Sequence, residues 1–189
     1  MSKLTQGEKI LNFEFDTVEK DKVDFYNFLK EGQDKTLLVF LRYFGCTLCQ
    51  LQMIDFKENI KKLEDLNVKL IVALQSERET IKEDDGAKDL PFEILLDPEQ
   101  KLYKEFDIKP AKSKLELADT RIAGKLIEAK KLGLEHGKYE GNELQLTAYF
   151  ILDKEGNILK THYAKNLCDM PDVNEFVEII EELVMINYK

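Results

Sequence analysis

The hydrophobic and polar positions follow two different patterns along the chain. Residues 36–43 and 68–74 are continuous apolar runs rich in β-branched and aromatic side chains. Such runs are typical of strands that are covered on both faces of a sheet. Between them, Met53, Phe56 and Ile60 recur at helical spacing, which predicts an amphipathic helix with its apolar stripe toward the core.

Shorter elements continue this alternation of strands and helices. Ser76 with Glu79, and Ser113 with Glu116, have the spacing of capping boxes and predict two further helix starts. The other predicted elements are strands over 13–16, 92–97, 147–152 and 157–163, the last two joined as a hairpin at Gly156, and helices over 23–30, 99–106 and from Asp169 and Pro171 onward. This order predicts a single α/β domain over residues 1–189, with a central mixed β-sheet flanked by helices on both faces.

The composition limits the kinds of partner. The chain has 28 basic and 37 acidic residues, a net charge of −9, whereas nucleic acid and anionic membranes attract clustered positive charge. No apolar run approaches the ~20 residues that span a bilayer, and residues 1–9 lack the apolar core of a signal peptide. We therefore expect a cytoplasmic protein that binds neither nucleic acid nor membrane.

The candidate chemistry lies in a pair of cysteines. Cys46 and Cys49 form a Cys-x-x-Cys motif where a predicted central strand ends and a helix begins. Free N–H groups at a helix N-terminus stabilise a thiolate, which is the reactive form of cysteine. The spacing lets the two sulfurs meet across the first helical turn, so the pair can cycle between dithiol and disulfide. The third cysteine, Cys168, lies far along the chain, and we interpret it as a small, half-buried residue rather than a resolving thiol.

Arg42 is the candidate partner of these thiols. It is one of three arginines and lies seven residues before Cys49. A guanidinium there could stabilise a thiolate or orient a peroxide oxygen, or it could be a surface residue without such a role.

A zinc site at the cysteine pair is disfavoured, because the remaining ligands would have to come from single residues without ligand spacing (Cys168, His136 or His162).

Three segments carry a resemblance to a known family. They are Leu38-Val-Phe-Leu-Arg-Tyr-Phe-Gly-Cys-Thr-Leu-Cys49, Phe92-Glu-Ile-Leu-Leu-Asp-Pro98 with Leu102-Tyr103, and Phe150-Ile-Leu-Asp-Lys-Glu-Gly156. Over residues 13–183 the chain resembles the thioredoxin-fold peroxiredoxins of the AhpC/TSA superfamily, and most closely their peroxiredoxin-like branch with a Cys-x-x-Cys motif. The resemblance implies a thioredoxin-like fold and redox chemistry at the cysteine pair.

The typical peroxiredoxin motif, Pro-x-x-x-Thr-x-x-Cys, leaves the choice of nucleophile open. Its reactive cysteine corresponds to Cys49, its threonine to Cys46 and its proline to Arg42. Thr147 stands where these proteins tend to have an arginine. In a thioredoxin-like mechanism Cys46 is the nucleophile and Cys49 is the resolving thiol. In a peroxiredoxin-like mechanism Cys49 is oxidised to the sulfenic acid, and Cys46 condenses with it to form the disulfide. From the sequence we favour Cys49 as the peroxide-reactive thiol.

These observations lead to a functional hypothesis and an alternative. We expect a thiol-dependent antioxidant oxidoreductase that reduces peroxides or disulfides through Cys46 and Cys49, with no bound cofactor and an external dithiol reductant such as a thioredoxin. The alternative is a redox-sensing, thioredoxin-like binding protein without steady peroxidase turnover. Residues 112–146 form a predicted helical insertion, which could cover the active site, complete the interface of a homodimer, or pack on the sheet.

Overall fold

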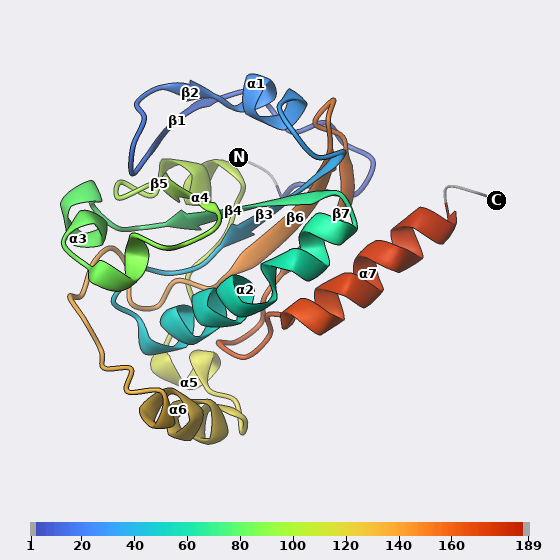
Figure 1. Cartoon of the computed structure of the whole chain (residues 1–189). Helices are drawn as coiled ribbons and strands as arrows, with labels where there is room; N and C mark the ends of the chain where they lie inside the picture. The colour runs from blue at the N-terminus through green and yellow to red at the C-terminus, as the bar shows by residue number, and fades with distance from the viewer. Residues whose placement is uncertain (1–2, 187–189) are drawn as a thin grey trace.

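The centre of the molecule is a seven-stranded mixed sheet, described here by a computed structural model that covers residues 3–186. Strand β3 (Lys35–Phe40) pairs in parallel with β4 (Val68–Leu74), which pairs in parallel with β5 (Glu93–Leu96). The remaining strands are antiparallel to their neighbours: β1 (Glu14–Thr17), β2 (Val23–Asp24), β6 (Ala148–Asp153) and β7 (Ile158–Tyr163). The strand order is β2-β1-β5-β4-β3-β6-β7 (Figure 1).

Two hydrophobic cores form on the two faces of this sheet. In β3, Leu37 and Val39 belong to one core, while Leu38 and Phe40 belong to the other. Successive side chains of a strand point to opposite faces, so a continuous apolar run supplies both cores. This explains why the sequence shows no alternation over this strand.

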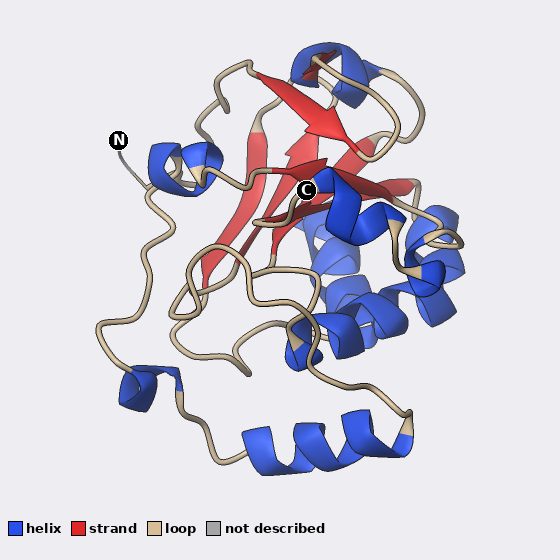
Figure 2. Ribbon diagram, turned by 90° about the vertical axis from the view of Figure 1, so that its left-hand side faces the viewer, coloured by secondary structure: helices blue, strands red, loops and turns tan. Residues whose placement is uncertain are grey.

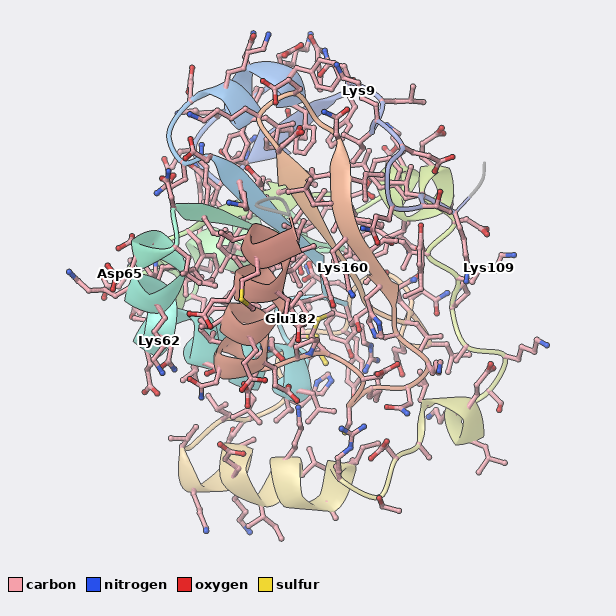
Figure 3. The ribbon with its side chains drawn as sticks, turned by 90° about the vertical axis from the view of Figure 1, so that its right-hand side faces the viewer. Lys9, Lys62, Asp65, Lys109, Lys160 and Glu182 are labelled. Atoms are coloured by element: carbon pink, nitrogen blue, oxygen red, sulfur yellow. The ribbon has the colours of Figure 1, made fainter. Side chains whose placement is uncertain are left out.

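Helices cover both faces, as predicted. Helices α2 (Thr47–Asp65) and α7 (Val173–Ile186) pack against one another on the first face, whereas α1 (Phe25–Lys30) and α4 (Lys101–Glu105) cover the second. Figure 3 shows Lys62 and Asp65 on α2 and Glu182 on α7, and all three are exposed at the outer surface. Among the helices between residues 3 and 186, none combines the length and apolar character needed to cross a membrane.

The predicted start of α3 (Arg78–Lys82) is corrected by the structure. Its N-cap is Glu77, and the Ser76 hydroxyl instead accepts a hydrogen bond from the backbone N–H of Phe44, at 2.8 Å. Residue 44 is 32 positions away along the chain, so a tertiary contact has taken the side chain that the local pattern assigned to capping. A short 3-10 turn, η1 (Asp85–Ala87), follows this helix.

The helix predicted over residues 23–30 is shorter than expected, because Val23 and Asp24 pair with β1 and the helix begins at Phe25.

At the other end of the chain, α7 is capped by Asp172 rather than Asp169. Asp172 accepts from the N–H of Glu175, and the Glu175 carboxylate accepts in return from the N–H of Asp172. Here a capping box does form.

The insertion over residues 112–146 is helical only in part. It contains two helices, α5 (Lys114–Leu117), which begins after Ser113 as predicted, and α6 (Ile122–Lys131), with a break at 118–121. Figures 1 and 2 show both helices beyond one end of the sheet, joined to it by long segments. Residues 133–146 return from α6 toward β6 and pass the start of α2.

Candidate active site

Cys46 and Cys49 lie at the carboxyl end of β3, where α2 begins. Cys46 is the N-cap residue of α2, and Cys49 lies in its first turn. Both side chains belong to the core between the sheet and α2, with exposed fractions of 3% and 4%. Ligand sites of parallel sheets lie at this edge, so the fold brings the motif to a suitable place.

Arg42 contacts both cysteines. Its backbone N–H donates to Cys49 Sγ at 3.4 Å, and its Nη1 donates to Cys46 Sγ at 3.6 Å. Arg42 as a whole is 8% exposed, and its Nη2 also donates to the backbone carbonyl of Glu143. Arg42 is therefore buried beside the thiols, not at the outer surface.

The two thiols have opposite pKa shifts. The pKa of Cys46 is lowered to about 6, first because the Cys49 thiol donates to its thiolate, and further because of the Arg42 charge and the N–H groups of Leu48 and Cys49. Burial raises the pKa of Cys49 well above its usual value, and the neighbouring Cys46 thiolate raises it further. These shifts favour a Cys46 thiolate with Cys49 as its protonated donor, in contrast to the sequence-based preference for Cys49 as nucleophile.

The returning segment 133–146, part of the predicted insertion, completes the site, although no local motif indicated its individual contacts. The N–H of Gly137 donates to the carbonyl of Gly45 at 2.8 Å, directly before Cys46. On the other side of the cysteine, Gln50 Nε2 donates to the carbonyl of Glu135 at 3.0 Å. Backbone carbonyls carry no sequence signature, so these partners of the site are visible only in the folded chain.

The other candidate residues lie apart from the thiol pair or have other roles. Cys168 is buried, 2% exposed, and burial raises its pKa. His136 Nε2 lies 3.0 Å from the Tyr43 hydroxyl, whereas His162 Nε2 lies 3.0 Å from the carbonyl of Asp169. Within residues 3–186, no group of three or more His, Cys, Asp or Glu side chains is arranged to hold a metal ion.

A mixed sheet with a Cys-x-x-Cys motif at the start of a helix defines the class of thioredoxin-fold proteins. The sequence model of the AhpC/TSA family matches residues 6–161, most of the chain, and the protein belongs to this family. This match confirms the predicted resemblance to peroxiredoxins, and the solved structures that follow confirm the predicted thioredoxin-like fold.

Individual relatives agree with this assignment. Peroxiredoxin-like 2C of Bos taurus is 24% identical over 157 residues, which cover 77% of this chain and 68% of the relative. A mutant of Peroxiredoxin 6 of Arenicola marina superposes with a TM-score of 0.74 at 18% identity, over 98% of this chain and 76% of the other. A yeast mitochondrial 1-Cys peroxiredoxin gives a TM-score of 0.70 at 17% identity, over 98% and 78%. At these identities the structural likeness shows the fold alone.

Proposed function

We propose that this protein is a thiol peroxidase that cycles between a Cys46/Cys49 dithiol and a disulfide. The observation that carries the proposal is the position of Cys46 Sγ, at the N-cap of α2 and 3.6 Å from Arg42 Nη1, with the Cys49 thiol beside it. A positive charge and a helix N-terminus both stabilise the thiolate that attacks a peroxide. Membership of the AhpC/TSA family supports the same chemistry.

In this cycle Cys46 is the nucleophile. Its thiolate attacks one oxygen of a hydroperoxide ROOH, the O–O bond breaks, and the alkoxide leaves and takes a proton from water as ROH. Cys46 then carries a sulfenic acid, and the Cys49 thiol condenses with it to form the disulfide and release water. The local partner lets this second step proceed without a large displacement of either sulfur.

Arg42 assists at the first step. Its Nε is buried and has no hydrogen-bond partner among residues 3–186. A buried donor without a partner is unfavourable, and an incoming peroxide oxygen could accept from it. In the proposed cycle, Arg42 therefore stabilises the thiolate through Nη1 and orients the oxidant through Nε.

An external dithiol completes the proposed cycle by supplying two electrons and two protons to the Cys46–Cys49 disulfide. The yeast 1-Cys peroxiredoxin has a thiol resolving mechanism via glutathione/thioredoxin systems, and a thioredoxin is the reductant we propose here. A cytoplasmic location and a homodimer stay predictions.

Serine variants test the proposal. Reduced wild-type protein and the variants Cys46→Ser, Cys49→Ser and Cys168→Ser are mixed with hydrogen peroxide, and mass spectrometry locates the products. We expect no rapid oxidation in Cys46→Ser, a trapped sulfenic acid on Cys46 in Cys49→Ser, and wild-type behaviour in Cys168→Ser. Retained turnover in both Cys46→Ser and Cys49→Ser would contradict the proposal, and a sulfenic acid on Cys49 would restore the nucleophile favoured from the sequence.

The burial of both sulfurs favours the redox-sensing alternative as a second candidate. With exposed fractions of 3% and 4%, the thiols would react slowly with large partners, and the disulfide would then act as a stable signal. Steady-state peroxide consumption with a thioredoxin system distinguishes the two, since a sensor oxidises once and does not turn over.

A further inference from the structure

The segment 133–146, which we name the strap, binds the chain on both sides of Cys46. It contacts Gly45 and Gln50 through its own backbone, and it holds Arg42 through the carbonyl of Glu143. The Tyr43 hydroxyl lies 3.0 Å from His136 of the strap. The residues that precede and follow the thiol are therefore tied to one segment that is distant in sequence.

The strap and the loop before Cys46 pack backbone against backbone. A Cβ placed on Gly45 would overlap the carbonyl oxygen of Lys138 and lie 2.8 Å from the carbonyl carbon of Gly137. No side chain fits between the two segments at this point. A shallow recess of about 450 Å³ opens beside them, lined by Phe44 and Gly45 on one side and by Leu134 and Lys138 on the other.

Glu140 fastens the strap to the segment around α3. One carboxylate oxygen accepts from the Thr80 hydroxyl at 2.7 Å and from the backbone N–H of Glu77 at 3.2 Å. Next to it, the side-chain oxygen of Gln75 accepts from the N–H of Asn142 at 2.7 Å. Together these bonds form a polar latch between the strap and residues 75–80.

The latch is satisfied only in part. The second carboxylate oxygen of Glu140 and the side-chain nitrogen of Gln75 are buried without a hydrogen-bond partner among residues 3–186. Buried polar atoms without partners cost free energy, which opening of the strap to water would recover. Hydration of these two atoms therefore lowers the free-energy cost of opening the strap.

We propose that the strap selects the reactants of Cys46 by size, with Glu140 as the positioning residue that holds it closed. This inference rests on the proposed peroxidase function only for the identity of the reactants, a hydroperoxide and a dithiol. A small hydroperoxide reaches Cys46 while the strap is closed, whereas a bulky hydroperoxide or a protein dithiol requires the strap to move. Thiol–disulfide exchange needs direct approach of the attacking sulfur to the disulfide. The closed strap therefore slows a protein reductant more than it slows a small hydroperoxide.

The test compares small and large reagents on Cys46 in the reduced full-length protein. The alkylating pair is iodoacetamide and a polyethylene-glycol maleimide, and the oxidising pair is hydrogen peroxide and cumene hydroperoxide. We expect the wild type to react more slowly with the larger member of each pair, relative to glutathione as an unhindered thiol. Glu140→Ala should accelerate the large reagents by about tenfold, equivalent to about 1.4 kcal/mol in favour of the open strap, and leave the small ones nearly unchanged.

Matched variants separate positioning from general loosening. Glu140→Gln keeps the accepting oxygen and should restore wild-type selectivity, while Thr80→Val removes one bond of the latch and should give a smaller acceleration. Glu128→Ala changes an exposed carboxylate of α6, outside the strap and the latch, and should have no effect. Cys168 is an internal control, since it is buried next to Asp119, Arg121 and Lys125 rather than the latch residues, and it should stay unreactive in Glu140→Ala.

The outcomes distinguish this proposal from the peroxidase function. Equal relative rates for small and large reagents in the wild type would overturn size selection, even if hydrogen peroxide oxidises Cys46 rapidly. Exposure of Cys168 together with Cys46 in Glu140→Ala would overturn the role of Glu140. Size-selective alkylation without any reaction with hydrogen peroxide would support the strap and overturn the peroxidase function.

Discussion

Arg42 shows how a single residue acquires its role from its surroundings. Its place before the cysteine pair made it a candidate from the sequence, but the surface alternative was equally consistent with that place. The structure brings its guanidinium to Cys46 and its backbone N–H to Cys49. One residue thus touches both sulfurs, and its charge favours the thiolate form of Cys46.

The pH dependence of Cys46 follows from these contacts. Because the pKa of Cys46 is lowered to about 6, its alkylation by iodoacetamide should increase as the pH rises through this value and level off above it. Arg42→Met removes the positive charge and should move the midpoint upward by about 1 pH unit. Arg78→Met, which removes a half-buried arginine paired with Asp21, is the control, and an unchanged midpoint in Arg42→Met would contradict the assigned contact.

Two glycines provide a matched pair of substitutions. Gly45→Ala forces a Cβ against the backbone of the strap and should cost about 1–3 kcal/mol of stability. Gly124→Ala lies in α6 with no atom within 4 Å of the added Cβ and should stabilise the protein by about 0.5–1 kcal/mol. Urea denaturation of both variants measures whether the free energy of unfolding falls in Gly45→Ala and rises in Gly124→Ala. An unchanged free energy of unfolding in Gly45→Ala would argue against close packing of the strap.

At the scale of the elements, capping motifs were the least reliable part of the prediction. The pair Ser76 and Glu79 matches a capping box in sequence, yet the Ser76 hydroxyl binds the N–H of Phe44 instead. Ser113 is the N-cap residue of α5 but makes no side-chain capping bond. A short polar side chain has several partners within reach, and the packed neighbours decide which one it takes.

Asp172 and Ser113 should therefore differ when each is replaced by alanine. Asp172→Ala removes the acceptor for the N–H of Glu175 and should destabilise the protein by about 1 kcal/mol. Ser113→Ala removes no capping bond, and its effect should stay within about 0.5 kcal/mol. Denaturant midpoints of the two variants decide the comparison, and equal losses would show that the observed caps do not control helix stability here.

At the scale of the whole molecule, the sheet separates two cores with different relations to the active site. Phe176 of α7 packs against Phe56 of α2, with ring centroids 5.9 Å apart, in the core that contains both cysteines. Phe150 of β6 packs against Phe40 and belongs to the opposite core. Cavity-forming substitutions in the two cores should therefore lower the free energy of unfolding by similar amounts, but they should differ in their effect on the reactivity of the thiols.

Phe176→Ala and Phe150→Ala test this separation. Each leaves a cavity at a fully buried position and should cost about 3–5 kcal/mol. Only Phe176→Ala should also accelerate alkylation of Cys49 below the unfolding transition, because local opening follows the contacts that hold α2. Equal acceleration in both variants would mean that the protein opens as one cooperative unit.

Much of the fold and part of the site could be predicted from the sequence alone. The strands of the sheet centre, α2 and the place of Cys46 and Cys49 at its start depend on local patterns: apolar runs, helical spacing and a fixed spacing between two cysteines. Such patterns reflect the strand and helix periods, which are properties of neighbouring residues. They also carried the resemblance to peroxiredoxins that the family match confirms.

Only the tertiary structure decided the electrostatics and the enclosure of the site. Which sulfur is the favoured thiolate depends on burial, on the Arg42 guanidinium and on N–H groups that face it after folding. The strap reaches the site through backbone groups of residues almost a hundred positions away, such as Gly137 on Gly45. Every residue offers the same backbone donors and acceptors, so their partners are selected by packing and leave no pattern in the sequence.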